Sequence, residues 1–283
     1  MIIHELRLNQ KDLHFALNYA NIARSTYYYH ISRRRKDKYE EVRKRIKEIF
    51  TLHNFRYGYR RVYLQLRNEG FTINHKTVQK LMQEMGLKSI VRRKKYNSFK
   101  GEVGKAAPNI LNRNFKATKP NMKWATDLTE FKIAGEKVYL SPIIDLFNRE
   151  IISYSISKTP NVAMVLDMLK EAKKKVKNTE EVILHSDQGY QYRSYLYQET
   201  LKDFGIIQSM SRKGNCLDNA VIENFFSIFK TEFLYLHKFN DIDSFNKELK
   251  IYIDYYNNER IKLNLNGMSP VQYRTHTEIF VNN

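Results

Sequence analysis

The chain has 283 residues, of which 42% are hydrophobic, enough for one large domain or two of modest size. No N-terminal apolar segment resembles a signal peptide and no apolar run reaches membrane length, so the sequence predicts neither a secreted nor a membrane-spanning protein. Cys216 is the only cysteine, which excludes a disulfide framework or a Cys-based zinc site within one chain and indicates a reducing cytoplasm.

The net charge of +19 is unevenly distributed along the chain. Residues 1–120 hold 28 of the 49 Lys and Arg residues but only 9 of the 30 Asp and Glu residues, whereas the remainder is balanced. A basic segment attached to a neutral body indicates a polyanionic partner, and nucleic acid is the leading candidate. An anionic membrane surface is the weaker alternative, because the basic helices have no obvious amphipathic face anchored by Trp.

Helices are predicted in the first part of the chain. A short helical element ends near residue 30, and residues 37–53 place apolar side chains at helical spacing among basic ones. A second helix ends at Gly70, and a third, with Thr72 or Asn74 as its N-cap, closes at Gly86. Two helices joined by a short Gly-containing turn predict a helix-turn-helix, whose second helix enters the DNA major groove; a plain three-helix packing domain is the alternative. The side chains of that helix expected to meet DNA are Lys76, Gln79, Lys80 and Gln83.

The segment after Gly86 loses this periodicity. It mixes glycines and prolines with a basic cluster formed by Arg92, Arg93, Lys94 and Lys95. This composition predicts a linker that follows DNA phosphates, and an ordinary solvated linker has the same composition. We therefore expect a helix-turn-helix DNA-binding region at 1–87, a basic linker at 88–120, and a larger domain with a C-terminal helical tail at 121–283.

Strand patterns begin at Trp124. The predicted strands are 123–133, 137–145, 150–157, 180–187 and 206–211, and the predicted helices are 161–176, 194–205, 218–230 and 241–260. The first three strands read as a meander of hairpins, after which strand and helix alternate. This order predicts an α/β domain with a mixed five-stranded sheet and helices on its faces.

Two of the predicted strands carry an aspartate. Asp127 lies inside the first strand, and Asp187 follows the apolar run VILH and precedes a turn at Gly189. Core strands rarely carry acids unless the charge is paired or binds a metal ion. Together with Glu223 on a helix, these carboxylates are hard oxygen ligands of the kind that Mg²⁺ or Mn²⁺ takes. A pair of such ions can stabilise both sides of a phosphoryl displacement.

The helix predicted over residues 218–230 has one broad apolar side. Its opposite side carries a polar stripe of Asn219, Glu223, Ser227 and Lys230. A solvated helix face is the plain interpretation of Glu223 and Lys230. The presence of Asp127 and Asp187 on predicted strands favours a metal site that includes Glu223 instead.

Three motifs carry a resemblance to a known family. They are W-x-x-D-x-T at Trp124–Thr129, HSDQGYQY at His185–Tyr192 and DNAVIENFFSIFK at Asp218–Lys230, with 35 residues between Asp187 and Glu223. Together they resemble the DDE transposases, whose ribonuclease-H-like core is shared with retroviral integrases, and in particular the OrfB product of bacterial insertion sequences with two overlapping reading frames. YGYRR at 57–61 and YNNER at 256–260 extend the resemblance over nearly the whole chain, although Lys262 stands where a His is frequent.

The resemblance implies a ribonuclease-H-like fold and a DNA transposase that cleaves 3′ ends and joins them to target DNA by direct transesterification. Asp127, Asp187 and Glu223 are then the catalytic residues and the ligands of two Mg²⁺ (or Mn²⁺) ions. One ion helps to deprotonate the nucleophile and the other stabilises the leaving 3′-oxygen. Residues expected around the metal ligands are His185 and Asn219, and further residues expected at DNA are Lys230, Arg60 and Arg61.

The partners implied are double-stranded DNA, namely the terminal repeats of the element and its target, and at least one further copy of the chain. The upstream-frame product is another candidate partner. A nucleoid-associated position in the cytoplasm is expected, without a membrane. Two alternatives remain: a simple nuclease of the same fold, and a DNA-binding regulator of transposition that joins no DNA by itself.

Overall fold

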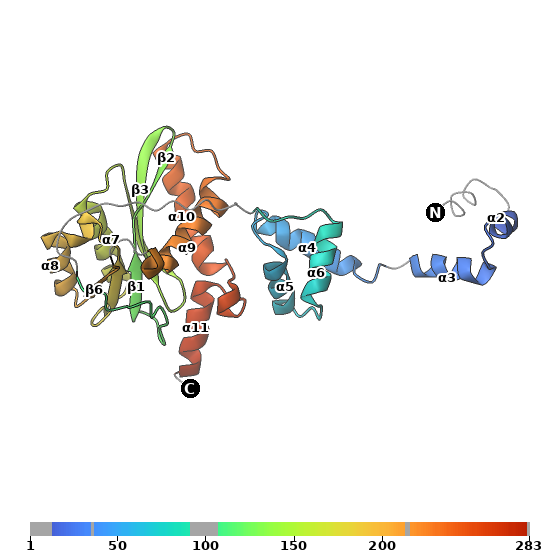
Figure 1. Cartoon of the computed structure of the whole chain (residues 1–283), viewed down its shortest axis with the longest axis horizontal. Coiled ribbons are helices and arrows are strands. Elements are labelled where there is room, and N and C mark those ends of the chain that lie inside the picture. The colour runs from blue at the N-terminus through green and yellow to red at the C-terminus, as the bar shows by residue number, and fades with distance from the viewer. Residues whose placement is uncertain (1–12, 35–36, 91–106, 213–215, 282–283) are drawn as a thin grey trace.

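The computed structural model describes residues 13–34, 37–90, 107–212 and 216–281. Ahead of the sheet these residues form α2 (Leu13–Tyr19), α3 (Arg24–Arg34), α4 (Glu40–Leu52), α5 (Tyr59–Asn68) and α6 (His75–Glu84). Helices α4, α5 and α6 pack around a shared core that includes Ile46, Val62 and Val78. This helical domain lies beside the C-terminal helices of the larger domain (Figure 1).

Helix α6 begins and ends where its sequence predicts. Asn74 rather than Thr72 is the N-cap, because its side-chain oxygen accepts a hydrogen bond from the Lys76 backbone N–H at 2.8 Å. Gly86 follows the helix with a φ of +70°, a conformation that glycine adopts at little cost. Val78, Leu81 and Met82 are buried, so the helix turns its polar side away from the domain core.

The larger domain is built on a mixed six-stranded sheet. Its strands are β1 (Lys123–Thr126), β2 (Thr129–Ile133), β3 (Glu136–Asp145), β4 (Ile151–Ser157), β5 (Ile183–Ser186) and β6 (Ile207–Met210). Strand β3 pairs antiparallel with β4 along one edge and with β2 and then β1 along the other. Strands β5 and β6 continue the sheet from β1 in parallel. The fold class predicted from the sequence, a ribonuclease-H-like mixed sheet with flanking helices, is confirmed.

The predicted first strand is divided in two, which accounts for the sixth strand. Strand β1 ends at Thr126 and β2 begins at Thr129, while both pair with the same continuous β3. The interruption falls on Asp127 and Leu128. Asp127 Oδ1 accepts a hydrogen bond from the Leu128 N–H at 2.7 Å, a local bond that competes with regular ladder pairing.

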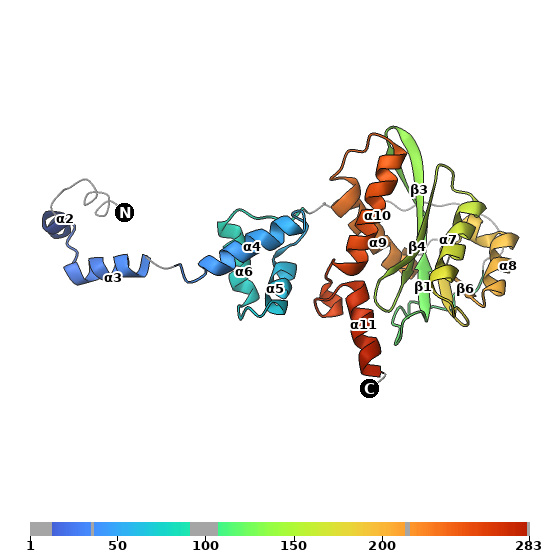
Figure 2. The ribbon, with the colours of Figure 1, turned by 180° about the vertical axis from the view of Figure 1, so that it is seen from behind.

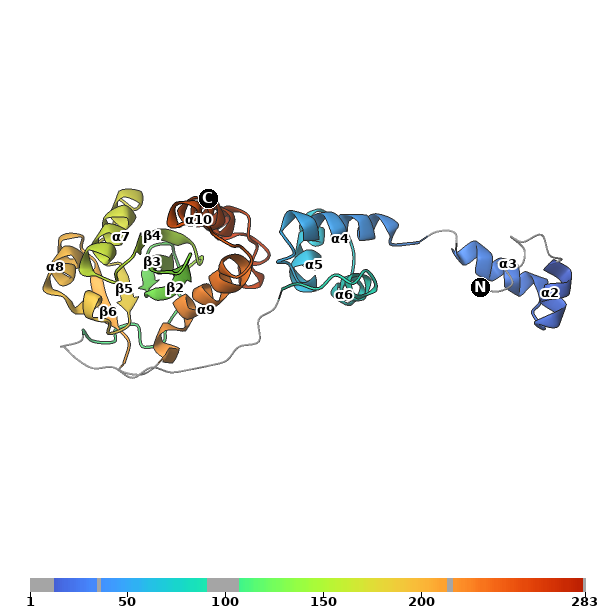
Figure 3. The same ribbon diagram turned by 90° about the horizontal axis from the view of Figure 1, so that it is seen from above.

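Helices cover both faces of the sheet (Figure 3). On one face lie α7 (Val162–Lys175) and α8 (Tyr195–Asp203), and on the other α9 (Ala220–Phe229) and α10 (Ile242–Asn258). The alternation of side chains along a strand explains the division, because Trp124 joins the core under α7 while Ala125 joins the core under α9. A further helix, α11 (Pro270–Val281), was not predicted from the sequence. No described helix is both long and apolar enough to cross a bilayer.

The helical domain packs against the tail of the larger domain (Figure 2). The Tyr57 hydroxyl accepts a hydrogen bond from the Ile261 N–H at 3.2 Å, and Asn68 Nδ2 donates to the Gly267 carbonyl at 3.0 Å. Ile261 itself is buried in the core of the helical domain. The YGYRR and YNNER motifs, about 200 positions apart, therefore meet in one interface.

A buried ion-pair network lies at the centre of this interface. Arg260, of which 1% is exposed, donates through Nε and Nη2 to the two Glu232 oxygens at 2.6 and 2.7 Å. Arg61 Nη1 of the helical domain reaches Glu232 Oε1 at 3.2 Å. Glu232 lies in a π-helical turn, Lys230–Leu234, that continues directly from α9. The network thus joins the helical domain to the helix that bears Glu223.

Candidate active site

Asp127 lies where the sheet backbone leaves regular pairing. The buried Trp124, Ala125 and Thr126 fix strand β1 between β3 and β5, so the position of the following residue is well defined. Asp127 itself is partly exposed at the end of this strand. Its carboxylate can therefore reach a ligand outside the sheet.

Asp187 follows the end of β5, the parallel neighbour of β1. The carboxyl ends of parallel strands lie at the same edge of a sheet, so Asp127 and Asp187 emerge together. Asp187 Oδ1 accepts a hydrogen bond from the Gly189 N–H at 2.9 Å. A Cβ on Gly189 would lie 2.9 Å from that oxygen and 2.6 Å from Gln191 Nε2, so a side chain at 189 would require Asp187 or Gln191 to shift.

Glu223 lies in the first turn of α9. The helix is anchored by the buried Ile222, Phe225, Phe226 and Phe229, and Glu223 is on its exposed side. This is the amphipathic arrangement predicted from the sequence. Asn219 is the N-cap residue of the helix.

The charges of Asp187 and Glu223 act on the carboxyl group of Asp127. Burial raises the pKa of Asp127 well above its usual value, and the negative charges of Asp187 and Glu223 raise it further. The Leu128 N–H and the Asn219 amide lower the pKa of Asp127 and so act in the opposite direction. Burial also raises the pKa of Asp187, while the Gly189 N–H and the Arg193 charge lower it.

Within the described part of the chain, no three His, Cys, Asp or Glu side chains are gathered closely enough to ligate one ion. The three carboxylates therefore influence one another electrostatically without forming a closed ligand set.

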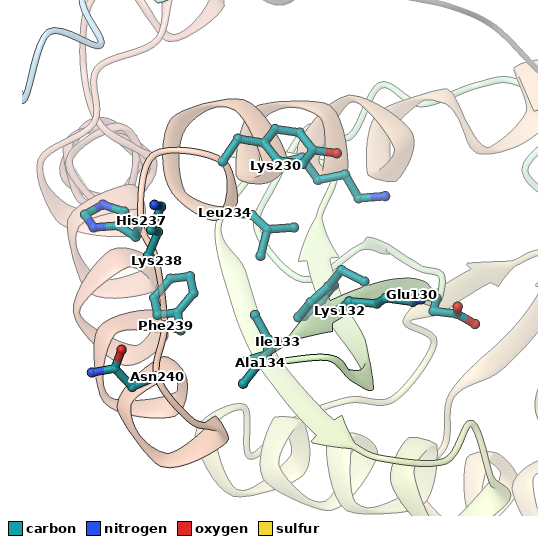
Figure 4. A pocket seen from close by; sticks show the side chains of 12 residues that line it. Glu130, Lys132, Ile133, Ala134, Lys230, Leu234, His237, Lys238, Phe239 and Asn240 are labelled. Atoms are coloured by element: carbon teal, nitrogen blue, oxygen red, sulfur yellow. The ribbon is translucent and has the colours of Figure 1, made fainter.

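A cleft of about 660 Å³ adjoins the C-terminal end of α9 (Figure 4). Lys230 and Leu234 line it from the α9 side, and Glu130, Lys132 and Ile133 line it from β2. Its remaining wall, residues 237–240, includes Lys238. The charged residues that line the cleft are thus three lysines, Lys132, Lys230 and Lys238, and one carboxylate, Glu130.

The residues predicted to surround the acids have different environments. His185 is fully buried, and its Nδ1 lies 2.8 Å from Ser209 Oγ on β6. Burial lowers the pKa of this imidazole, so its neutral form is favoured. Asn219, also buried, is close enough to lower the pKa of Asp127.

The residues predicted to bind DNA are spread over several elements. On α6, Lys76, Lys80 and Gln83 are exposed and Gln79 is partly buried. Arg60 is exposed, and Arg61, whose side chain is 22% exposed, forms an ion pair with Glu232. The linker residues Arg92, Arg93, Lys94 and Lys95 lie outside the described residues.

One element of the site was not predicted from the sequence. Asp218, which lies just ahead of α9, is a buried acceptor for Arg212 and Arg113. Arg212 Nε lies 2.9 Å from Asp218 Oδ2, and Arg113 Nε lies 2.8 Å from Oδ1. These bonds hold the pKa of Asp218 well below its usual range and fix the chain ahead of α9. Arg113 precedes Asp218 by 105 positions, and no local pattern predicts such a pair.

Comparison with known proteins places this geometry in a family. Residues 117–216 and 223–277 match two models of an integrase core domain, and residues 37–95 match an HTH-like domain. The chain is 53% identical over 277 residues to the IS150 transposase InsK of Escherichia coli K12, covering 98% of each protein. The chain belongs to the insertion-element transposases. A second relative, the IS904 transposase of Lactococcus lactis, is 36% identical over 84% of this chain and 94% of its own length.

Among solved structures, the transposase is similar to the HTLV-2 integrase catalytic core domain in complex with magnesium. The identity is 19%, the TM-score is 0.44, and the match covers 56% of this chain and 98% of that one.

Proposed function

We propose that this transposase cleaves the 3′ ends of its element and joins them to target DNA, using Asp127, Asp187 and Glu223 around divalent cations. The observation that supports this proposal is the electrostatic interaction of the three acids: burial raises the pKa of Asp127, and the negative charges of Asp187 and Glu223 raise it further. Hard oxygen donors with excess negative charge fit Mg²⁺ or Mn²⁺, one ion or two. When bound, such ions lower the pKa of the attacking hydroxyl and stabilise the leaving oxygen.

The chain's own residues supply position and charge. Strands β1 and β5 fix Asp127 and Asp187 in a common register, and the buried side of α9 holds Glu223 opposite them. Asn219 lies near enough to Asp127 to lower its pKa, while His185 supports β5 through Ser209. Lys230, on the rim of the cleft, binds a phosphate of the strand entering the site.

DNA recognition is divided between two regions in this proposal. Lys76, Lys80 and Gln83 on the exposed side of α6, with Gln79 beside them and Arg60 on α5, contact the terminal repeat. The transposase acts on the bacterial nucleoid in the cytoplasm as at least a dimer, because two element ends must be held together. We propose that the chain is divided as the sequence predicts, into a DNA-binding region at 1–87, a basic linker at 88–120 and a catalytic domain with its helical tail at 121–283.

A strand-transfer assay with labelled terminal DNA and Mg²⁺ tests the function. Joined product is expected from the wild-type chain, and neither cleaved nor joined product from Asp187→Asn, with DNA binding nearly unchanged. Glu171→Gln, on the exposed side of α7, is the matched control and is expected to remain active. Cleavage without joining identifies a nuclease, and binding without either reaction identifies a regulator. Activity in Asp187→Asn would reject the metal assignment.

A further inference from the structure

A second cavity, of about 330 Å³, lies against α9 and shares no lining residue with the lysine-lined cleft. Arg149, from the turn between β3 and β4, and Lys262, from the tail, both line it. Asn224 and Asn264 add amide groups, and Ile144 and Phe225 add apolar surface. The cavity therefore presents two cations and no carboxylate.

Neither cation has an acidic partner among the described residues. Arg149 Nη1 is buried and has no hydrogen-bond partner in the described part of the chain. Lys262, 8% exposed, donates to the neutral Tyr256 hydroxyl at 2.9 Å, and its ammonium lies 4.4 Å from the centre of that ring. Burying a polar group without a hydrogen bond is costly, so the unpartnered Arg149 nitrogen beside the buried Lys262 requires an explanation.

The nearby acids are all engaged elsewhere. Glu232 is held by Arg260 and Arg61, and Glu150 accepts from Arg274 Nε at 2.9 Å. The Asp145 oxygens accept backbone N–H groups of Asn121 and Phe147 at 2.8 and 2.9 Å. Asp145 and Glu232 therefore act on Arg149 and Lys262 only at longer range, and no described carboxylate forms an ion pair with either cavity cation.

The positive charges around Lys262 further disfavour its charged form. Burial and the positive charges of Arg260, Arg61 and Arg149 lower the pKa of Lys262 well below its usual value, and only Glu232 opposes them. An anion placed between Arg149 and Lys262 would reverse this effect and satisfy both donors.

We propose that this cavity is a phosphate site, in which Arg149 and Lys262 bind a tetrahedral phosphate oxyanion. Arginine offers a planar fork that matches phosphate oxygens, and lysine adds a compact charge. The phosphate is supplied either by the DNA backbone or by free inorganic phosphate. Because Val221 and Asn224 form part of the wall, occupancy also supports the first turns of α9. The proposal does not depend on cation binding at Asp127, Asp187 and Glu223.

Thermal unfolding of the full chain without divalent ions tests this site. Sodium phosphate, compared with sodium chloride at equal ionic strength, should raise the wild-type Tm by about 2–4 °C once its concentration is several times the dissociation constant. Arg149→Gln and Lys262→Met should each lose this rise. The control Lys170→Met, which removes an exposed lysine of α7, should keep it. In chloride, Lys262→Met should be at least as stable as wild type, because it removes a buried charge without an acidic partner.

An equal rise in all four proteins would overturn the proposal, because phosphate also stabilises proteins in general by exclusion from their surface. No rise in wild type would overturn it as well. The source of the phosphate is resolved by repeating the measurement with a saturating 20-base-pair DNA duplex. Loss of the phosphate-dependent rise shows that DNA fills the site, and its persistence shows that free phosphate does.

Discussion

Removing Arg260 should destabilise the transposase severely. Its side chain is 1% exposed and donates twice to Glu232, itself 9% exposed, so Arg260→Leu leaves a carboxylate in a low-dielectric environment. Breaking a buried pair by removing one partner costs about 3–5 kcal/mol. Arg61, at 3.2 Å, remains to offset part of the charge, which favours the lower end of that range.

The double variant Glu232→Leu/Arg260→Leu separates charge burial from packing. Replacing both partners with apolar side chains is often close to neutral, so the double variant should be more stable than Arg260→Leu. The assay is urea unfolding followed by circular dichroism, with the two single variants completing the cycle. For a chain of this size, the loss in Arg260→Leu corresponds to a fall in Tm of roughly 6–20 °C. Additive costs in the double variant, or a cost below about 1 kcal/mol in Arg260→Leu, would refute the reasoning.

Two further predictions concern the active site and the domain interface. Gly189→Ala should preserve the fold but reduce strand transfer at least about tenfold, because the added Cβ displaces the Asp187 carboxylate. A tenfold loss is equivalent to roughly 1.4 kcal/mol of activation free energy. Unchanged single-turnover rates would contradict this prediction. His53, stacked on Tyr57 at 3.8 Å, has its pKa lowered to about 4, chiefly by burial. Its folded form binds fewer protons than its unfolded form, so stability should fall as pH drops from about 6.5 through 4. Equilibrium unfolding from pH 8 to 4 measures this fall, and His53→Phe should remove that part of it.

The sequence predicts much of the fold because its periodicities are strong. The apolar spacing of α9 and the β-branched runs of β3 and β5 identify those elements, and the spacing of the three acids indicates the site. The break between β1 and β2 is not visible in the sequence, because WATDLTEFKI contains no Gly or Pro that would mark an interruption. At the break, the Leu128 N–H donates a hydrogen bond to the Asp127 side chain. This local bond competes with continued pairing of the strand.

Long-range polar contacts could not be predicted either. Arg61 reads as a surface cation beside Arg60, yet Glu232, 171 positions further along the chain, engages it within the protein. Asp218 reads as a helix cap, yet two arginines surround it. Such pairings depend on tertiary approach and leave no local periodicity, so residue type alone did not distinguish a DNA contact from a structural ion pair.

The central claim is that Asp127, Asp187 and Glu223 bind divalent cations together. Electron paramagnetic resonance of Mn²⁺ titrated into the DNA-bound transposase measures this directly, by counting bound ions per chain. The account predicts saturable binding in wild type and in the exposed-acid control Glu171→Gln, and at least a tenfold weaker affinity, about 1.4 kcal/mol, in Asp187→Asn. Equal Mn²⁺ binding by wild type and Asp187→Asn would contradict it.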